Sequence, residues 1–120
     1  MITNRTYVTV AEYEKFLVEN KKHLPFNWDE QLKHPNFPVV NVTGINADAY
    51  CKYMNGRLPT DKELEDEFCP LWEWTSSSKE SLRIIRGGAW VYSSWLLRVS
   101  FRGYYLAVVR SDYVGFRCIK

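Results

Sequence analysis

The sequence lacks several features that would assign it to a well-defined class of protein. No hydrophobic run approaches the roughly 18 residues that a membrane-spanning helix needs, so membrane insertion is not expected. The first residues show no basic region followed by an apolar core, so we expect no signal peptide. Three cysteines are too few and too scattered for a disulfide framework or a zinc site. A reduced chain is therefore the default expectation, with one buried disulfide left open.

The composition that remains is typical of a folded domain. The 120 residues are expected to form one domain over residues 1–120, because chains usually divide only above roughly 250 residues. Hydrophobic residues make up 46% of the chain and charged residues 25%, which excludes disorder as the main state. Aromatic residues reach 16%, more than so small a domain is expected to bury.

The net charge of +2 conceals a strong asymmetry along the chain. Residues 1–80 hold nine basic and thirteen acidic side chains, whereas residues 81–120 hold seven basic side chains and one acidic. Six of these seven are arginines, placed singly among apolar and aromatic residues. A nucleic-acid-binding segment usually clusters its charges and includes lysines, so nucleic acid is not an expected partner. Isolated arginines suit planar guanidinium groups that pair within the structure.

Start signals predict helices in the first half of the chain. Thr9 and Glu12 have the spacing of a capping box, in which each side chain accepts a hydrogen bond from the other residue's backbone N–H. The residues behind this cap that share one apolar helical face are Tyr13, Phe16 and Leu17. Residues 21–38 contain three prolines and both histidines, and they predict a loop after this helix.

Two further helices are expected before residue 70. The first follows Thr43 and ends at Asn55-Gly56, which supplies a left-handed stop. Its buried face is expected to hold Ala47, Tyr50, Cys51 and Met54. Thr60 and Glu63 repeat the capping box, and they predict a short acidic helix that Cys69-Pro70 ends.

The second half of the chain is typical of β-structure. Four segments rich in aromatic and branched residues are expected to be strands: Leu71–Thr75, Arg83–Trp90, Leu97–Phe101 and Gly115–Ile119. Helices in the first half and antiparallel strands in the second imply a compact α+β fold rather than a doubly wound parallel sheet.

One carboxylate in the first of these strands stands out. Glu73 lies between Trp72 and Trp74, so in a strand the two indoles share one face and the carboxylate points to the other. The candidates for bidentate pairing with this carboxylate and with backbone carbonyls are Arg86, Arg98, Arg102 and Arg117. Structural roles are favoured for all of these residues.

Several motifs stand in a distinctive order along the chain: Pro38-Val-Val-Asn-Val-Thr43, Gly56-Arg-Leu-Pro-Thr60, Leu71-Trp-Glu-Trp-Thr-Ser76, Ile85-Arg-Gly-Gly-Ala-Trp90 and Gly115-Phe-Arg-Cys118. In this order they resemble the formylglycine-generating enzyme (sulfatase-modifying factor) family, over residues 9–118. The resemblance implies a variant of the C-type lectin-like fold. It also implies that Cys51 and Cys118 are neighbours, since the corresponding motif cysteines are disulfide-bonded in some relatives.

The same resemblance implies where a catalytic centre would lie. Members that oxidise cysteine bind copper through two cysteines, and the motifs place these positions at Ser94 and Val99, which supply no thiolate. Related iron enzymes use three histidines, but this chain has two. The family's calcium motif is replaced here by Cys69-Pro70. We therefore expect no enzymatic activity and no cofactor, and we assign no metal-binding residue, while a remaining calcium site stays open.

The segment of about residues 90–117 carries large side chains between the motif residues. With scaffold residues set aside, the candidates for ligand contact are Val91, Tyr92, Ser93, Ser94, Trp95, Leu96, Phe101, Gly103, Tyr104, Tyr105, Leu106, Val109, Ser111, Asp112 and Tyr113. Tyr, Ser and apolar residues dominate, as in antibody-type binding loops. The residues between Arg102 and Gly115 predict an unusually apolar surface loop, which usually marks an interaction site. The aromatic and apolar residues expected in the core are Trp90, Leu97, Val99 and Phe116.

This spacing also resembles the variable proteins of diversity-generating retroelements, which use the same lectin-like fold. The resemblance implies a fixed scaffold at Arg86-Gly-Gly-Ala-Trp90, Leu97-Arg98, Arg102, Arg110 and Gly115-Phe-Arg117. Adenine mutagenesis of asparagine codons would randomise the positions between these points. No asparagine follows Asn55, as expected if such codons have been altered.

Three hypotheses follow for the function. The favoured one is a non-catalytic, hypervariable binding module for a protein or other macromolecular ligand, in which alanine at Trp95, Tyr104 or Tyr105 leaves stability nearly unchanged. The alternative is an oxidase or other metalloenzyme of the parent family. A third is a structural domain of a phage particle with no ligand of its own. The expected location is the cytoplasm or a phage particle, and the oligomeric state stays open.

Overall fold

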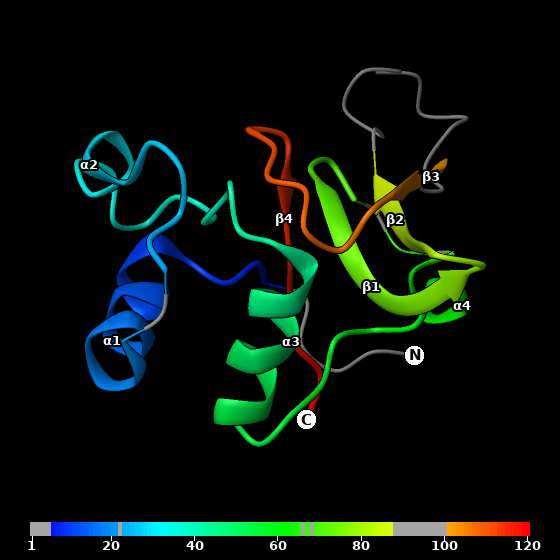
Figure 1. Cartoon of the computed structure of the whole chain (residues 1–120), viewed down its shortest axis with the longest axis horizontal. Helices are drawn as coiled ribbons and strands as arrows, with labels where there is room; N and C mark the ends of the chain where they lie inside the picture. Colours follow the sequence, from blue (N-terminus) through cyan, green and yellow to red (C-terminus); the bar gives the residue numbers. More distant parts are fainter. Residues whose placement is uncertain (1–5, 22, 66, 68, 88–100) are drawn as a thin grey trace.

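The computed structural model describes residues 6–21, 23–65, 67, 69–87 and 101–120. Its elements are α1 (Val10–Asn20), α2 (Trp28–Gln31), α3 (Gly44–Tyr53), α4 (Asp61–Leu64), β1 (Trp72–Lys79), β2 (Leu82–Gly87), β3 (Phe101–Tyr105) and β4 (Val114–Gly115). Helices precede strands, so the expected α+β class is confirmed (Figure 1). No helix within these described residues is both long and apolar enough to cross a membrane.

The predicted helix starts are present in the structure. The Thr9 hydroxyl accepts a hydrogen bond from Glu12 N–H at 3.2 Å, and the Glu12 carboxylate accepts one from Thr9 N–H at 2.9 Å. Thr60 and Glu63 form the same reciprocal pair at the start of α4. Both capping boxes are therefore confirmed, because this geometry depends only on residues three positions apart.

Two local expectations are refined by the structure. Residues 21–38 are not loop throughout, because Asn27 takes a left-handed conformation and opens the single turn α2. Trp28, at the start of this turn, is buried in the core. This burial stabilises a turn that the local sequence does not predict. The left-handed stop after α3 is confirmed at Asn55, whose φ is 63°.

Among the described residues, four strands form one sheet in the order β3-β2-β1-β4. β1 with β2 and β2 with β3 are antiparallel, as expected, but β4 runs parallel to β1. The expectation of an entirely antiparallel sheet was therefore wrong. Residues 106–113 carry the chain from one edge of the sheet to the other, and such a crossover connection permits parallel pairing (Figure 1).

The strand boundaries also differ from those expected. β1 continues beyond Thr75 to Lys79 in an antiparallel hairpin with β2. β2 spans Leu82–Gly87, in agreement with the expected strand over residues 83–87, and the remaining positions expected in that strand and the next, 88–90 and 97–100, lie outside the described residues. Most of the expected 115–119 strand is replaced by a single bridge between Ile119 and Arg57.

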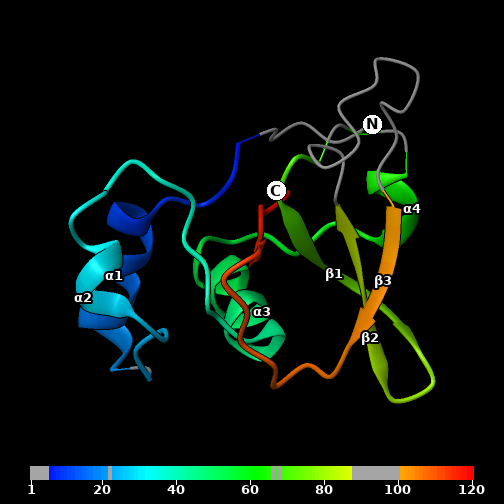
Figure 2. The ribbon, with the colours of Figure 1, turned by 90° about the horizontal axis from the view of Figure 1, so that it is seen from above.

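The register of the sheet separates a polar face from an apolar one. Glu73, Arg86 and Arg102 are paired across three strands and share one face, on which α4 packs. Trp74 and Ile85 lie on the other face, against which α3 packs. Accordingly, α3 lies between α1 and the sheet, as Figures 1 and 2 show from two directions. Displayed side chains on the same face of the sheet can lie together, whereas those on opposite faces cannot.

The close approach of β2 to β1 depends on a glycine. A Cβ at Gly87 would lie 2.4 Å from Trp72 Cα and 2.7 Å from the Leu71 carbonyl oxygen. Real Cβ atoms do not approach backbone this closely, so Gly87 lets the two chain segments touch.

An aromatic cluster forms the centre of the core. Its rings, which pack in tilted and edge-to-face arrangements at centroid distances of 5.3–6.3 Å, are those of Tyr13, Phe16, Trp28, Tyr50 and Phe116. Phe116 is fully buried, which confirms its expected place. The other residues expected with it (Trp90, Leu97, Val99) lie outside the described residues.

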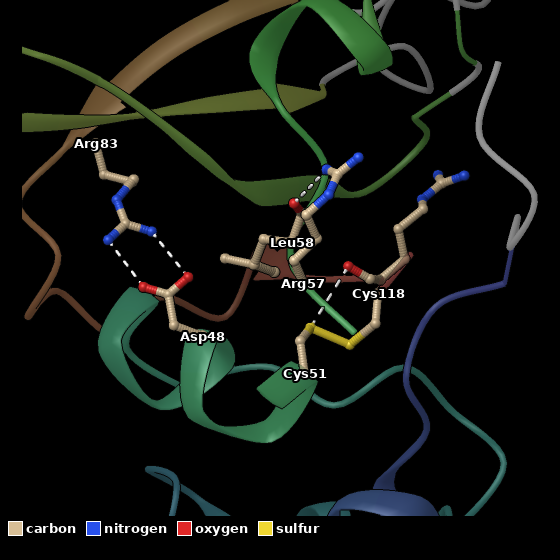
Figure 3. Close-up of a disulfide and its surroundings, with 7 residues drawn as sticks. Asp48, Cys51, Arg57, Leu58, Arg83 and Cys118 are labelled. Carbon is tan, nitrogen blue, oxygen red and sulfur yellow. Dashed lines mark hydrogen bonds and ion pairs between the residues drawn. A yellow bond between two sulfur atoms is a disulfide. The ribbon is translucent and has the colours of Figure 1, made fainter. Parts of the chain in front are cut away.

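A disulfide joins the helical half of the chain to its end. Cys51 at the end of α3 is bonded to Cys118 across a sequence separation of 67 residues (Figure 3). The two cysteines are therefore neighbours, as the family resemblance implied, and the default expectation of a reduced chain is wrong for this pair. Beside it, Asp48 of α3 forms an ion pair with Arg83 of β2, at 2.9 Å between Oδ2 and Nη2 (Figure 3).

Candidate functional site

Arg117, which follows the predicted contact residues in the chain, forms a buried ion pair with Glu73 of β1. Arg117 Nε lies 2.7 Å from Glu73 Oε1, and Arg117 Nη2 lies 2.5 Å from Oε2. The two side chains are 3% and 0% exposed. Burial lowers the pKa of Arg117, but the hydrogen bonds and the charge of Glu73 outweigh this and raise it, so the guanidinium stays charged. The expected arginine partner of Glu73 is thereby identified as Arg117.

A second carboxylate, Asp61, binds two further arginines. Arg86 Nε lies 2.5 Å from Asp61 Oδ1, and Arg102 Nη2 lies 2.9 Å from Oδ2. From the sequence, Glu73 was considered as the partner of Arg86 and Arg102, but both side chains bind Asp61 of α4 instead. Burial would raise the Asp61 pKa, but hydrogen bonds from Arg86 and Arg102 hold it below its ordinary value. This ionised carboxylate therefore fixes the outer strand β3 to α4.

Part of the predicted contact set lies outside the described residues. Arg98, which was expected to pair within the framework, lies outside the described residues. The predicted contact positions that share this status are Val91, Tyr92, Ser93, Ser94, Trp95 and Leu96. Phe101 begins β3, so its backbone is placed in the outer strand.

Three predicted contact residues are half-buried in the structure. A Cβ at Gly103 would lie 3.0 Å from Ile85 Cγ1, so this position faces the sheet rather than an open loop. Val109 packs against the core cluster. The Ser111 hydroxyl accepts a hydrogen bond from Tyr113 N–H, and its carbonyl accepts one from Asn41 N–H. These three half-buried residues therefore contribute more to the packing beneath the surface than to side chains projecting from it.

The largest predicted side chains are exposed. Tyr104 and Tyr105 are 40% and 36% exposed, Leu106 49% and Tyr113 63%. Tyr104 and Tyr105 were expected in a surface loop, but they lie in β3, paired with Ile84 and Arg83. Being consecutive in a strand, the two rings point to opposite faces of the sheet. The candidate site therefore wraps around the β3 side of the sheet instead of forming one flat loop.

Exposed apolar residues follow Tyr105 along the chain, and a backbone hydrogen bond links this segment to the start of α3. The Tyr105 ring packs against Trp74 at a centroid distance of 6.3 Å, and Ile45 N–H donates to the Ala107 carbonyl. Ile45 is 53% exposed and Val108 is 63% exposed. We define the apolar surface as Ile45, Tyr105, Leu106 and Val108.

Asn41 holds the chain that follows this surface. Its carbonyl accepts hydrogen bonds from Arg110 Nη1 at 2.7 Å and from Phe26 N–H at 3.3 Å. Its side-chain amide donates to Asp112 Oδ1 at 2.7 Å, and its own N–H donates to Ser111. Asn41 is 3% exposed, so these bonds fix residues 110–112 from a buried position. Asp112 thus contributes to the local structure as well as to the surface.

Comparison with known proteins matches this chain to one family. The family described as "Sulfatase-modifying factor enzyme 1-like domain" matches residues 2–68 and 69–120. The chain belongs to this family. No curated protein sequence matches the chain significantly.

Within this sulfatase-modifying-factor-like domain, the described side chains do not fit a copper centre. Two of the three cysteines are bonded to each other, and Cys69 Sγ lies 4.0 Å from Arg117 Nη2, whose positive charge opposes a metal cation. Ser94 and Val99, the positions that the resemblance assigns to copper ligands, lie outside the described residues. Within the described part of the domain, no cluster of three His, Cys, Asp or Glu side chains could hold a metal ion.

Sequence reasoning missed two elements of this domain's surface. Ile45 lies outside the apolar stripe predicted for α3, and only its contact with Ala107 shows its place beside the displayed residues. It also lines a groove of about 450 Å³ beside α3, whose other walls include Lys52, Arg57 and Leu58. Lys79 lies 5.9 Å above the Tyr104 ring, a contact across two strands that no local pattern could predict.

Proposed function

We propose that this sulfatase-modifying-factor-like domain is a non-catalytic binding module. Its framework, of the C-type lectin-like type, displays a diversified aromatic and apolar surface to a protein or other macromolecular ligand. The resemblance of residues 86–117 to the variable proteins of diversity-generating retroelements supports this proposal.

The observation that carries the proposal is a difference between two sets of neighbouring side chains. The arginines are bound within the structure, whereas the large side chains between them are exposed. The described arginines that alternate with the displayed residues are bound to Glu73, Asp61 or backbone carbonyls. Between them, five large side chains are 36–63% exposed: Tyr104, Tyr105, Leu106, Val108 and Tyr113. Exposed apolar clusters of this kind usually mark interaction surfaces. Tyrosines in such surfaces supply contact area at low entropic cost.

The residue types at the copper positions of the family, together with the described cysteines, support the non-catalytic part of the proposal. The family resemblance assigns the copper-binding positions of oxidising members to Ser94 and Val99, and neither side chain is a soft ligand. The disulfide and the Arg117 contact leave no described cysteine suited to that role. Binding of a ligand needs none of these groups.

Display selection tests the proposal. One library of this chain is randomised at Tyr104, Leu106 and Val108, and a matched library at Val18, Leu24 and Phe37, which are equally or more exposed. Selection on immobilised test proteins is expected to yield specific binders at least tenfold more often from the first library. Equal yields, or general loss of folding in the first library, would contradict the proposal.

The retroelement assignment has its own test. The flanking DNA is expected to contain a reverse transcriptase gene and a near-copy of the coding region for residues 90–117 that differs at template adenines. The oxidase alternative instead requires stoichiometric copper or iron in the purified protein and turnover of a cysteine peptide.

A further inference from the structure

One edge of the sheet is open in the described part of the chain. β3 stands at the end of the strand order, and among the described strands only β2 pairs with it (Figure 2). Within the described residues, the main-chain groups of residues 102–105 form no hydrogen bond outside this pairing. Alternate residues of an antiparallel edge strand direct both their N–H and C=O groups away from the neighbouring strand. β3 therefore presents main-chain donors and acceptors at this edge.

The opposite edge of the sheet is covered. β4 consists of Val114 and Gly115, and both are buried. The Val8 N–H donates a hydrogen bond to the carbonyl of Phe116, directly after β4, at 3.0 Å. A Cβ at Gly115 would lie 3.0 Å from the Val39 carbonyl oxygen, so a second segment of the chain also packs closely against β4. A strand from another molecule can therefore pair with the β3 edge but not with the β4 edge.

β3 itself has few of the features that prevent pairing with another strand. It contains no proline and no lysine, and its register with β2 is continuous from Phe101 to Tyr105. Its one charged side chain, Arg102, is bound to Asp61 of α4, which holds it against one face of the sheet. Proteins usually protect an edge strand with proline, charge, a bulge or a covering segment. An edge strand without this protection is typical of a site that pairs with another chain.

The displayed tyrosines lie on both faces of this one strand. Tyr104 points to the face on which α4 packs, whereas Tyr105 packs against Trp74 on the other face. A ligand that rests on one face of the sheet can contact only one of these rings. An extended segment along β3 places successive side chains on alternate faces, so it can contact both.

We propose that this domain binds an extended segment of a protein ligand as a further strand beside β3. This inference rests on the proposed binding function and adds the form of the partner. Main-chain hydrogen bonds to the β3 edge do not depend on the ligand's sequence, whereas Tyr104 and Tyr105 contact its side chains and give specificity. Exchange of the displayed side chains would therefore change specificity and leave the main-chain contribution in place.

N-methylated peptides test the main-chain contacts. Linear peptides are selected from a random library on the immobilised whole chain, and each is then made in two forms. One form is N-methylated at alternate residues, and the other at the residues between them. Only alternate residues of an added strand face β3, so one form should lose affinity at least about tenfold and the other less than about threefold. Amide hydrogen exchange should slow at alternate residues of β3 when the unmodified peptide binds.

Two variants test whether one ligand contacts both faces. Tyr104→Ala and Tyr105→Ala should each lower the affinity of the same peptide at least about threefold, because an added strand touches both rings. The control Tyr53→Ala removes a tyrosine of similar exposure, 38%, from α3 and should leave affinity unchanged. If a variant unfolds, the N-methylated peptides still decide the question, because they leave the protein unaltered.

The outcomes separate this inference from the function on which it rests. Peptides that lose affinity in Tyr105→Ala or Val108→Glu but respond equally to both N-methylation patterns would overturn strand addition and leave the binding function standing. The same conclusion follows if no linear peptide binds while the randomised libraries of this chain yield specific binders of test proteins. Failure of both the peptides and the libraries would overturn both proposals. A dimer of the chain alone, detected by sedimentation, that excludes the peptides would show that a second copy occupies this edge and would overturn the protein ligand.

Discussion

At the scale of single residues, we expect the buried ion pair of Glu73 and Arg117 to tolerate substitution least. Glu73→Gln leaves Arg117 buried without its counter-charge, and we expect the free energy of unfolding to fall by about 3 kcal/mol. Urea denaturation measures this change. The control Lys33→Gln disrupts an exposed pair with Glu30 and should cost less than about 0.5 kcal/mol. Equal effects of the two substitutions would show that the buried pair is not a framework contact.

A second residue-scale prediction concerns acid stability. Hydrogen bonds from Arg57, despite partial burial, lower the pKa of Glu63 from 4.5 to about 2. A carboxyl with a lower pKa in the folded state adds stability above pH 4.5, which is lost as the pH falls towards 2. The Arg57 side chain is 53% exposed, so we expect a loss of about 1 kcal/mol.

Glu63→Gln tests this assignment because glutamine retains the capping box but not the charge. Unfolding followed by circular dichroism at stepped pH should show a shallower loss of stability in the variant below pH 4.5. A remaining slope is expected from Asp61, whose pKa is also lowered. An unchanged profile would mean that the Arg57 pair does not contribute.

At the scale of elements, the contact between β1 and β2 limits substitution. Gly87→Ala places a Cβ against the backbone of residues 71–72, so the strands must separate, and we expect a loss of about 2 kcal/mol. Thermal unfolding measures the loss against Ser81→Ala in the exposed turn, which should be near neutral. A neutral Gly87→Ala would contradict the tight strand packing.

The elements also show what the sequence could predict. Both capping boxes follow from residues three positions apart, so they were predictable in detail. The direction of β4 and the position of Tyr104 in a strand depend on pairing between distant segments, so local patterns missed them. The binding of Arg102 by Asp61 spans 41 residues and could not be distinguished from binding by Glu73. The sequence could predict a segment rich in exposed aromatic and apolar side chains. It could not predict that Tyr104 and Tyr105 point to opposite faces of the sheet.

At the scale of the whole molecule, the disulfide ties the helical half to the end of the chain. It closes a loop across 67 residues, which corresponds to about 4 kcal/mol of restricted unfolded-chain entropy. We expect the Cys51→Ala, Cys118→Ala double variant to unfold at a markedly lower temperature than the oxidised protein. Scanning calorimetry with and without reductant checks this. A reductant-insensitive wild-type transition equal to that of the variant would contradict a bond in solution.

The central claim is that the framework holds its shape while the displayed side chains are exchangeable. The most direct measurement is the free energy of unfolding of one combined variant, Tyr104→Ser, Leu106→Ser, Val108→Ser and Tyr113→Ser, against Phe116→Ala. We expect a change within about 1 kcal/mol for the combined variant and a loss of about 3 kcal/mol or more for Phe116→Ala. A combined variant as unstable as Phe116→Ala would show that these side chains build the core, and would contradict the claim.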